Sequence, residues 1–396
     1  MSLQPTIESY ITNLHEDGSG IFSDYIKLHL FHNEKNIFKL LSFEDDNTFL
    51  EPLLNLKESY NPFPEFSITQ VLFGYMADDK APKEIEVYSD CTGKVYLPKI
   101  GYFLSHVRDS LLLLRKGHDD YYLLKDGITL DFKFYPITFI PHTNIEIVEF
   151  NNPLLNAKFE GDYSDNNVLI KNGFDNYADT IISVLEKIGE CSTWFHALII
   201  NTIKKIVLFE NTTNKSFASL NTLGINYINT NLDRGFYSIL ESFVYLSFRN
   251  IYFISVFENT TYFNIEVKKG YINAFNKNTA DQRYIGSIVG SAFSILAICR
   301  FYSKLINKEN YLDAKDHIEI HARLIFNIRK LGRLLSDIDF PEIFTPEGLN
   351  FYHHLNDEYK SLNSQNLNQT YIFYNQGEIF DMNLFIKVNM VSVNAG

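Results

Sequence analysis

The spacing of hydrophobic and polar positions changes along the chain. Residues 84–150 are rich in β-branched and aromatic side chains, and Gly, Pro and Asp-Gly signals divide them into short runs such as IEVYSD and GKVYLPKIGYF. This pattern predicts strands and hairpins, with one helix between Leu104 and Leu114. Residues 22–41 before it have helical periodicity. The Asn-rich segment 151–175 is the best boundary, so we assign an N-terminal α+β region to residues 1–165.

Helical periodicity dominates the second half of the chain, which we assign to a domain over residues 170–360. Two short apolar runs, IKKIVLF and GINYINT, predict strands within it. The pattern predicts helices over residues 175–190, 193–203, 233–257, 283–305 and 311–335, and another after the TPEG turn.

The ends of two segments carry turn and capping signals. Asn231 or Asp233 is placed to cap the helix of residues 233–257. Asn375-Gln-Gly377 lies between apolar runs and predicts a hairpin, so we expect a β-rich tail over residues 365–396. The fold class is therefore α+β: a mixed N-terminal half with β-hairpins, a mainly helical C-terminal half and a short C-terminal hairpin.

Charge and composition narrow the function. The chain has 396 residues, 45% of them hydrophobic, which is enough for a large core. Its formal net charge of −13 argues against nucleic acid or an anionic membrane as a partner, because phosphate groups are bound by clustered Lys and Arg. We expect neither.

Cysteine spacing and hydropathy point to the cytoplasm. Cys91, Cys191 and Cys299 are far apart and form no CxxC pair, which predicts neither a disulfide framework nor a zinc knuckle. The first twenty residues lack the pattern of a secretory signal. Residues 284–301 are the most apolar window, but they include glycines and serines and are shorter than a membrane span, so we expect a buried helix there.

One histidine pair has helical ligand spacing. His317 and His321 are four residues apart and would present two imidazoles on one helix face. Glu319 lies on another face, and no third ligand is evident. We therefore interpret the pair as a solvated surface feature and keep it only as an outside candidate for a metal site.

Tyr245 and Arg249 are polar side chains within a helix that is otherwise predicted to be buried. They lie four residues apart in the apolar stretch ESFVYLSFRN and so share one face of the predicted helix. The following helix carries Gly286 and Gly290, a small-residue strip that allows another helix to approach closely. Two such neighbours would share a cleft that contains a phenol and a guanidinium.

The order of features from Ile203 to Leu355 resembles the HExxH-type, 2-oxoglutarate-dependent peptide β-hydroxylases that modify ribosomally made peptides. In that family, two short strands around a polar loop lead to a helix with Val-His-Glu-x-x-His. Here the corresponding text is IKKIVLFENTTNKSFASLNTLGINYINTNLDRGFYSILESFVYLSFRN. The segments AFNKNTADQRYIGSIVGSAFSILAICRFYSKL and FTPEGLNFYHHL resemble the family's later helices and its Thr-Pro-x-Gly turn.

Laid on ESFVYLSFRN, the family motif is replaced at every ligand position. Tyr245 and Arg249 stand where the two metal histidines are expected, and Leu246 stands at the glutamate. Downstream, Val289 replaces the histidine between the two glycines, whereas Arg283 matches the family's arginine and is a weak candidate for cosubstrate binding. Leucine cannot ligate a metal and arginine stays protonated, so the resemblance implies a member that has lost its metal site.

The resemblance implies a pseudoenzyme that binds a precursor peptide or a partner maturation enzyme. Tyr245, Arg249 and Glu241 are the candidate peptide contacts, and Arg249 would pair with Glu241 or with a peptide carboxylate. The alternative is that Tyr245 and Arg249 only satisfy buried polar partners and replace the metal as internal scaffolding. No cofactor is expected. The first alternative is an active hydroxylase with Fe(II) and 2-oxoglutarate at a relocated site, and the second is a structural interaction protein unrelated to the family. The N-terminal half is a candidate for strand addition by a leader peptide.

Overall fold

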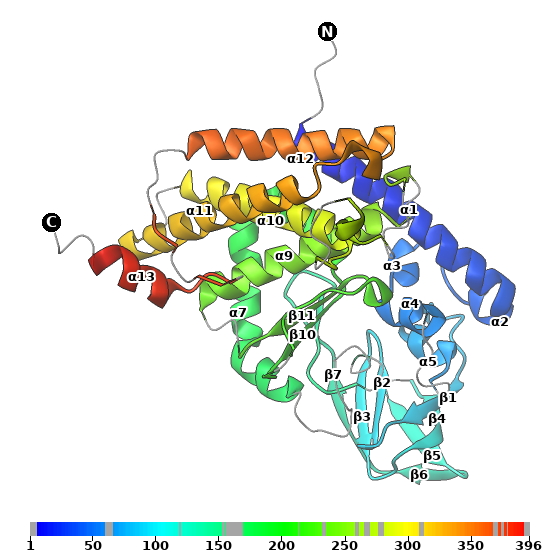
Figure 1. Ribbon diagram of the computed structural model, residues 1–396. Helices are drawn as coiled ribbons and strands as arrows, with labels where there is room; N and C mark the ends of the chain where they lie inside the picture. The colour runs from blue at the N-terminus through cyan, green and yellow to red at the C-terminus, as the bar shows by residue number, and fades with distance from the viewer. Residues whose placement is uncertain are drawn as a thin grey trace. The chain divides into compact units, whose positions relative to one another are not determined.

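The computed structural model divides into two compact units (Figure 1). We call residues 1–18, 183–199 and 234–396 the helical unit, and residues 19–182 and 200–233 the sheet unit. These units do not follow the predicted ranges, because residues 200–233 group with the N-terminal strands. The structure describes residues 6–59, 66–118, 120–152, 155, 169–212, 214–231, 235–257, 261–264, 270–275, 281–308, 313–366, 371–373, 376–377 and 379–391.

Three helices contribute residues to both units, and several short helices belong to the sheet unit alone. The three shared helices are α1 (Ile7–Asn33), α7 (Ile170–Cys191) and α8 (Thr193–Thr202). The short ones are α2 (Lys35–Phe38), α3 (Asp46–Phe49), α4 (Pro52–Ser59), α5 (Ile68–Leu72) and the 3₁₀ turns η1 (Phe73–Tyr75) and η2 (Leu220–Thr222).

Two antiparallel sheets follow the short helices. Strand β1 shows an alternating pattern, in which Ile85 and Val87 are buried and Glu84 and Glu86 are exposed. One sheet has the order β1 (Glu84–Ser89), β4 (Ser110–Lys116), β5 (Tyr121–Lys125), β6 (Ile128–Leu130). The other has the order β2 (Lys94–Leu97), β3 (Gly101–Ser105), β7 (Phe132–Pro136).

The predicted helix between Leu104 and Leu114 is wrong. Strands β3 and β4 occupy that stretch, and β3 pairs with β2 and β7 while β4 pairs with β1 and β5. Asp109, at the turn between them, has a left-handed φ of 45°. The leucine-rich run allows either structure locally, and pairing with strands distant in sequence decides it.

The third sheet contains Glu146 and Lys205, which line a pocket described in the next subsection. Its order is β11 (Ile225–Asn229), β10 (Lys205–Phe209), β9 (Glu146–Ile147), β8 (Thr138–Phe139), with β9, β10 and β11 parallel. Every residue of β10 and β11 is buried, which is typical of parallel strands covered on both faces. Both strands were predicted from the runs IKKIVLF and GINYINT, and both are confirmed.

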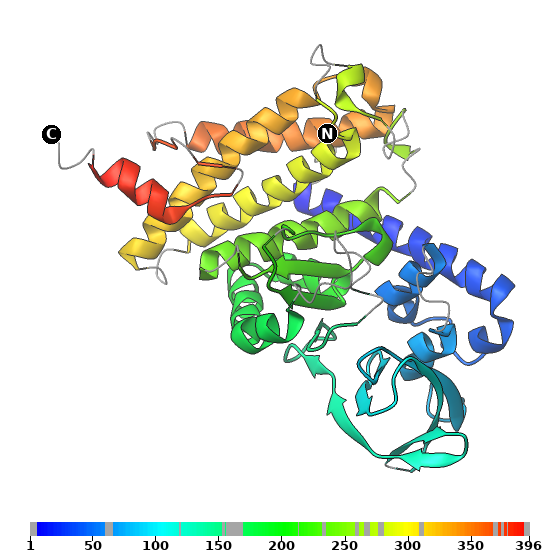
Figure 2. The same cartoon turned by 60° about the horizontal axis from the view of Figure 1, so that its bottom comes forward.

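The helical unit contains the long predicted helices. Helix α10 packs against α9, α11 and α12, and Figure 2 shows the yellow and orange helices α10 to α12 lying alongside one another. Helix α10 is long and apolar enough to span a membrane by composition, but 83% of its most apolar window is buried within the protein. The bounds are α9 (Phe236–Ser255), α10 (Ile285–Ile306), α11 (Ala314–Asp337) and α12 (Pro346–Gln365), with 3₁₀ turns η4 (Ile272–Ala274) and η6 (Pro341–Ile343).

Two local predictions in this unit are wrong. The N-cap of α9 is Gly235, which makes no side-chain capping bond, rather than Asn231 or Asp233, the latter lying outside the described residues. The tail forms helix α13 (Met382–Val391) instead of a hairpin, and its described residues contain no strand. Phe380 and Phe385 of the tail pack against α11, and this burial favours a helix with one apolar side.

Candidate functional site

The predicted pair on α9 faces α10. Tyr245 Oη lies 3.0 Å from Ser291 Oγ, and Arg249 Nη1 donates to the carbonyl oxygen of Ser287 at 2.9 Å. Arg249 Nη2 donates to Ser287 Oγ at 3.2 Å, and the guanidinium lies over the Phe253 ring at 4.9 Å. The structure therefore brings the sequence-predicted phenol and guanidinium together with two serines along the line where α9 and α10 meet. We call these four polar side chains, Tyr245, Arg249, Ser287 and Ser291, the α9–α10 seam.

Gly290 makes room for this arrangement. A Cβ atom at Gly290 would lie 2.3 Å from Arg249 Nη1 and 2.6 Å from the Tyr252 ring. Those distances are shorter than any real contact, so the guanidinium and the ring occupy space that only glycine leaves empty. The predicted small-residue strip is thus used for close packing between two helices.

The other two motif positions are core positions. Leu246 and Val289 are each 1% exposed. Neither side chain has an atom that can ligate a metal. Among the described residues, no group of three or more His, Cys, Asp or Glu side chains is arranged to hold a metal ion. The residues at the predicted motif therefore do not fit an Fe(II) centre.

Glu241 has other partners than the predicted Arg249. Its Oε2 lies 3.0 Å from Arg323 Nη1 and accepts from Tyr302 Oη at 3.2 Å, while its Oε1 accepts from Asn327 Nδ2 at 3.2 Å. Arg323 is 4% exposed, so this cluster links α9, α10 and α11 inside the helical unit. The alternative pairing of Arg249 with Glu241 is wrong.

The remaining candidates from the sequence, Arg283, His317 and His321, have other contacts. Arg283 is held by Asp281, at 2.7 Å, and by Asp337, at 2.8 Å. His317 and His321 share one face of α11 as predicted, with ring centroids 4.8 Å apart. Both are half-buried rather than fully solvated.

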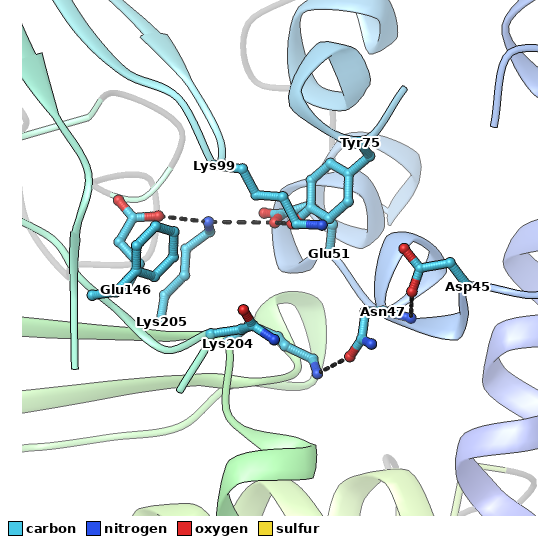
Figure 3. Close-up of a pocket in the computed structure, with 10 residues that line it drawn as sticks. Asp45, Asn47, Glu51, Tyr75, Lys99, Glu146, Lys204 and Lys205 are labelled. Carbon is cyan, nitrogen blue, oxygen red and sulfur yellow. Dashed lines mark hydrogen bonds and ion pairs between the residues drawn. The ribbon is translucent and has the colours of Figure 1, made fainter. Parts of the chain in front are cut away.

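The sheet unit contains a polar pocket that the sequence analysis did not predict (Figure 3). Its volume is about 220 Å³. The lining combines three carboxylates with three lysines, an unusual density of charge for a partly buried site. These residues are Asp45, Glu51, Glu146, Lys99, Lys204 and Lys205, and the remaining lining residues are Asn47, Tyr75, Phe139 and Asn144.

Lys205, at the start of β10, forms ion pairs with two of the carboxylates. Its Nζ lies 2.9 Å from Glu146 Oε2 and 3.3 Å from Glu51 Oε2, and all three side chains are at most 3% exposed. Figure 3 shows the ammonium group between the two carboxylates. Burial alone would lower the pKa of Lys205, but the charges of Glu146 and Glu51 outweigh burial and raise it.

Tyrosines complete the hydrogen bonding of both carboxylates. Tyr96 donates to Glu146 at 2.7 Å and Tyr102 donates at 3.2 Å, while Tyr75 donates to Glu51. Burial, and then the nearby Glu146 charge, raises the pKa of Tyr96 well above its usual range. These phenols therefore stay protonated and act as donors, so Glu146 and Glu51 each have hydrogen-bond and ion-pair partners within the protein.

Lys204 is placed by the backbone next to the same strand. Its N–H donates to the Gly224 carbonyl oxygen at 2.8 Å, and its carbonyl oxygen accepts from Glu146 N at 2.9 Å. Gly224 has a left-handed φ of 87°, which glycine adopts without strain. The side chain is 9% exposed, and its Nζ donates to Asn47 Oδ1 at 2.8 Å and to the Asn201 carbonyl oxygen at 3.0 Å.

The surroundings of Lys204 disfavour its charge. Burial lowers the pKa of Lys204 to about 8, even though Glu51 and Asp45 oppose that change from a distance. Among the described residues, no carboxylate lies within ion-pair distance of its Nζ, and both acceptors are neutral oxygens.

The rim of the pocket holds one more ammonium group. Lys99 is exposed, has a left-handed φ of 65°, and its Nζ lies 4.1 Å from the Tyr75 ring centroid. Asp45 caps α3, accepting from Asn47 N at 3.2 Å and from Thr48 Oγ1 at 3.0 Å. The pocket thus contains two lysines, Lys204 and Lys99, that contact no carboxylate among the described residues.

The sequence contained one signal for this pocket. The run IKKIVLF places two lysines at the start of an apolar strand, where charged residues are normally excluded. The other lining residues come from positions 45 to 146 and share no motif. Only the folded sheet unit brings them together.

Comparison with known proteins adds no identification. No family model matches this chain, and the search of curated proteins finds no significant match.

Proposed function

We propose that this chain is a non-catalytic binding protein of ribosomal peptide modification, which recognises a precursor peptide or a partner maturation enzyme through the α9–α10 seam. The observation that carries the proposal is the position of Arg249. It stands where the resemblance to the peptide hydroxylases expects a metal histidine, and it is instead bonded to Ser287 of α10. A guanidinium there repels a divalent cation.

The same contacts favour recognition of an acidic group. Arg249 is half-buried and its hydrogen-bond partners among the described residues are neutral oxygens, so its positive charge is not balanced by a carboxylate there. Arginine binds carboxylates in a planar, two-pronged geometry. A peptide carboxylate at the seam would accept from the guanidinium, with Tyr245 and Ser291 as adjacent hydrogen-bonding groups.

The cysteines fit the cytoplasm in which ribosomal peptides are modified. Cys91, Cys191 and Cys299 are all free thiols, and the latter two are buried. Free thiols are typical of a reducing compartment. We therefore place the proposed function in the cytoplasm.

Peptide selection tests the binding function. We would pan a displayed library of linear peptides against the wild-type chain and against Arg249→Ala. Enriched peptides that contain acidic residues, and that bind Arg249→Ala at least about tenfold more weakly, support the proposal, because a charge-assisted hydrogen bond contributes about that much. The exposed Arg108→Ala is the matched control. Peptides that bind both variants equally, or no enrichment at all, would contradict peptide binding at the α9–α10 seam.

Metal titration tests the absence of catalysis separately. We would titrate the wild-type chain anaerobically with Fe(II) and Mn(II), with and without 2-oxoglutarate, by calorimetry. We expect no stoichiometric binding. One tightly bound equivalent that 2-oxoglutarate strengthens would instead favour an active oxygenase with a relocated site.

A further inference from the structure

We propose that the pocket beside Lys204 binds a small organic or inorganic anion through a carboxylate or phosphate group, which the ammonium groups of Lys204 and Lys99 hold. This site is independent of the α9–α10 seam, because all of its lining residues belong to the sheet unit.

The first argument is the unbalanced charge of Lys204. A buried ammonium group normally has a carboxylate partner, because its transfer out of water costs several kcal/mol. Lys204 is 9% exposed and has only Asn47 and the Asn201 carbonyl as acceptors. An ammonium group has three N–H donors, so one remains for a ligand in the pocket.

The second argument is that the nearby carboxylates, Glu51 and Asp45, already have other partners within the protein. Glu51 accepts from Lys205, from Tyr75 and from the backbone N–H of Leu53, the last at 3.1 Å. Asp45 caps the short helix α3. Their charges reach Lys204 only at longer range, and they do not restore its pKa to the usual value. An anion in direct contact would do so.

The third argument is the position of Lys99. This lysine lies on the pocket rim, and its Nζ has no hydrogen bond or ion pair to the described residues, although it lies over the Tyr75 ring. In Figure 3 its side chain extends across that ring at the pocket. A long exposed lysine beside a buried one can close over an anion from the solvent side.

The volume limits the size of the ligand. A cavity of 150 Å³ holds a benzene molecule, so about 220 Å³ accommodates a molecule of about nine non-hydrogen atoms. Inorganic phosphate, a short dicarboxylate or a small phosphate ester has this size. A nucleotide or a peptide segment is too large.

Anion binding should depend on pH in a defined direction. The titratable groups that line the pocket together with Lys204 are Asp45, Glu51, Glu146, Tyr75, Lys99 and Lys205. Because Lys204 loses its proton near pH 8, the affinity for a ligand of constant charge should fall by up to about tenfold per pH unit above that value.

Calorimetry at constant ionic strength tests the proposal with two probes, inorganic phosphate and succinate. We expect saturable binding of at least one probe to the full chain. Lys204→Met should weaken it at least about tenfold, as expected for a lost charge-assisted bond. Lys99→Met should also weaken it, and this exposed substitution is not expected to affect folding. Lys83→Met, another exposed lysine of the sheet unit, is the matched control.

The outcomes distinguish the two ligand classes from each other and from the absence of a site. Binding of phosphate alone assigns the ligand to the phosphate class, and binding of succinate alone assigns it to the carboxylates. No saturable binding of either probe would overturn the proposal, and so would equal weakening by Lys83→Met and Lys99→Met. Neither result bears on peptide binding at Arg249, which the seam variants test.

Discussion

Lys204 and Lys205 are consecutive in the chain, yet their ammonium groups have opposite electrostatic surroundings. Lys205 Nζ lies 2.9 Å and 3.3 Å from two carboxylates, whereas Lys204 Nζ donates to two neutral oxygens at 2.8 Å and 3.0 Å. Both lysines line the pocket. The pair therefore offers an internal comparison between a lysine that stabilises the fold and one that is available to a ligand.

The first prediction concerns stability at pH 7. Lys205→Met should lower the free energy of unfolding by about 3–5 kcal/mol, because it leaves Glu51 and Glu146 buried without their shared cation. Lys204→Met should raise it by about 1–2 kcal/mol in the absence of ligand, because it removes a buried charge that no carboxylate contacts. Urea unfolding followed by circular dichroism measures both. Equal destabilisation by the two variants would show that Lys204 is also structural.

The second prediction concerns pH. Folding lowers the pKa of Lys204 from 10.5 to about 8, so the unfolded chain binds a proton that the folded chain lacks between those values. The free-energy cost of burying the protonated Lys204 side chain is therefore present in full below pH 8. It decreases as the pH rises toward 10.5. We expect the stability advantage of Lys204→Met to shrink over this window. An advantage that is constant from pH 7 to 10 would contradict the lowered pKa.

The third prediction tests the close approach of α9 and α10. Gly290→Ala should lower the free energy of unfolding by about 1–3 kcal/mol, because the new methyl group overlaps Arg249 and Tyr252. Gly20→Ala is the control with the opposite expected sign. Gly20 is exposed within α1 and has no atom within 4 Å of the added Cβ, so alanine should stabilise that helix by about 0.5–1 kcal/mol. Thermal unfolding of both variants measures the difference.

The fourth prediction tests the resemblance to the peptide hydroxylases. Tyr245→His and Arg249→His, combined in a chain that also carries His317→Ala and His321→Ala, should bind Mn(II) through two imidazoles one helical turn apart. Adding Val289→His should not tighten that binding, because Val289 lies on the side of α10 away from Ser287, Gly290 and Ser291, which contact Arg249 and Tyr245. Tighter binding with all three histidines is what the resemblance to the family implies instead.

The matched control for that variant keeps Val289. It carries only the histidines at positions 245 and 249, and we expect the two variants to bind Mn(II) equally. If the variant with Val289→His binds at least about tenfold more tightly than this control, then position 289 faces the other two, as the resemblance implies, and the described α9–α10 geometry is incorrect.

The long-range parts of the fold were the hardest to predict. The stretch from Leu104 to Leu114 was assigned to a helix, but pairing of β3 and β4 with distant strands makes it extended. The tail was assigned to a hairpin, but packing of Phe380 and Phe385 against α11 accompanies a helix there. In both cases the local pattern allows two structures, and tertiary contacts select one.

The sequence by itself determined the α+β class, the long helices α9 to α12, strands β10 and β11, and the shared face of Tyr245 and Arg249, because helical and strand periodicity are local properties. Only the tertiary structure decided which partners those residues have. It bonded Arg249 to Ser287 and Glu241 to Arg323, and it brought Glu51, Glu146 and Lys205 together from distant positions. Charge pairing depends on distances in space, which the order of residues along the chain does not specify.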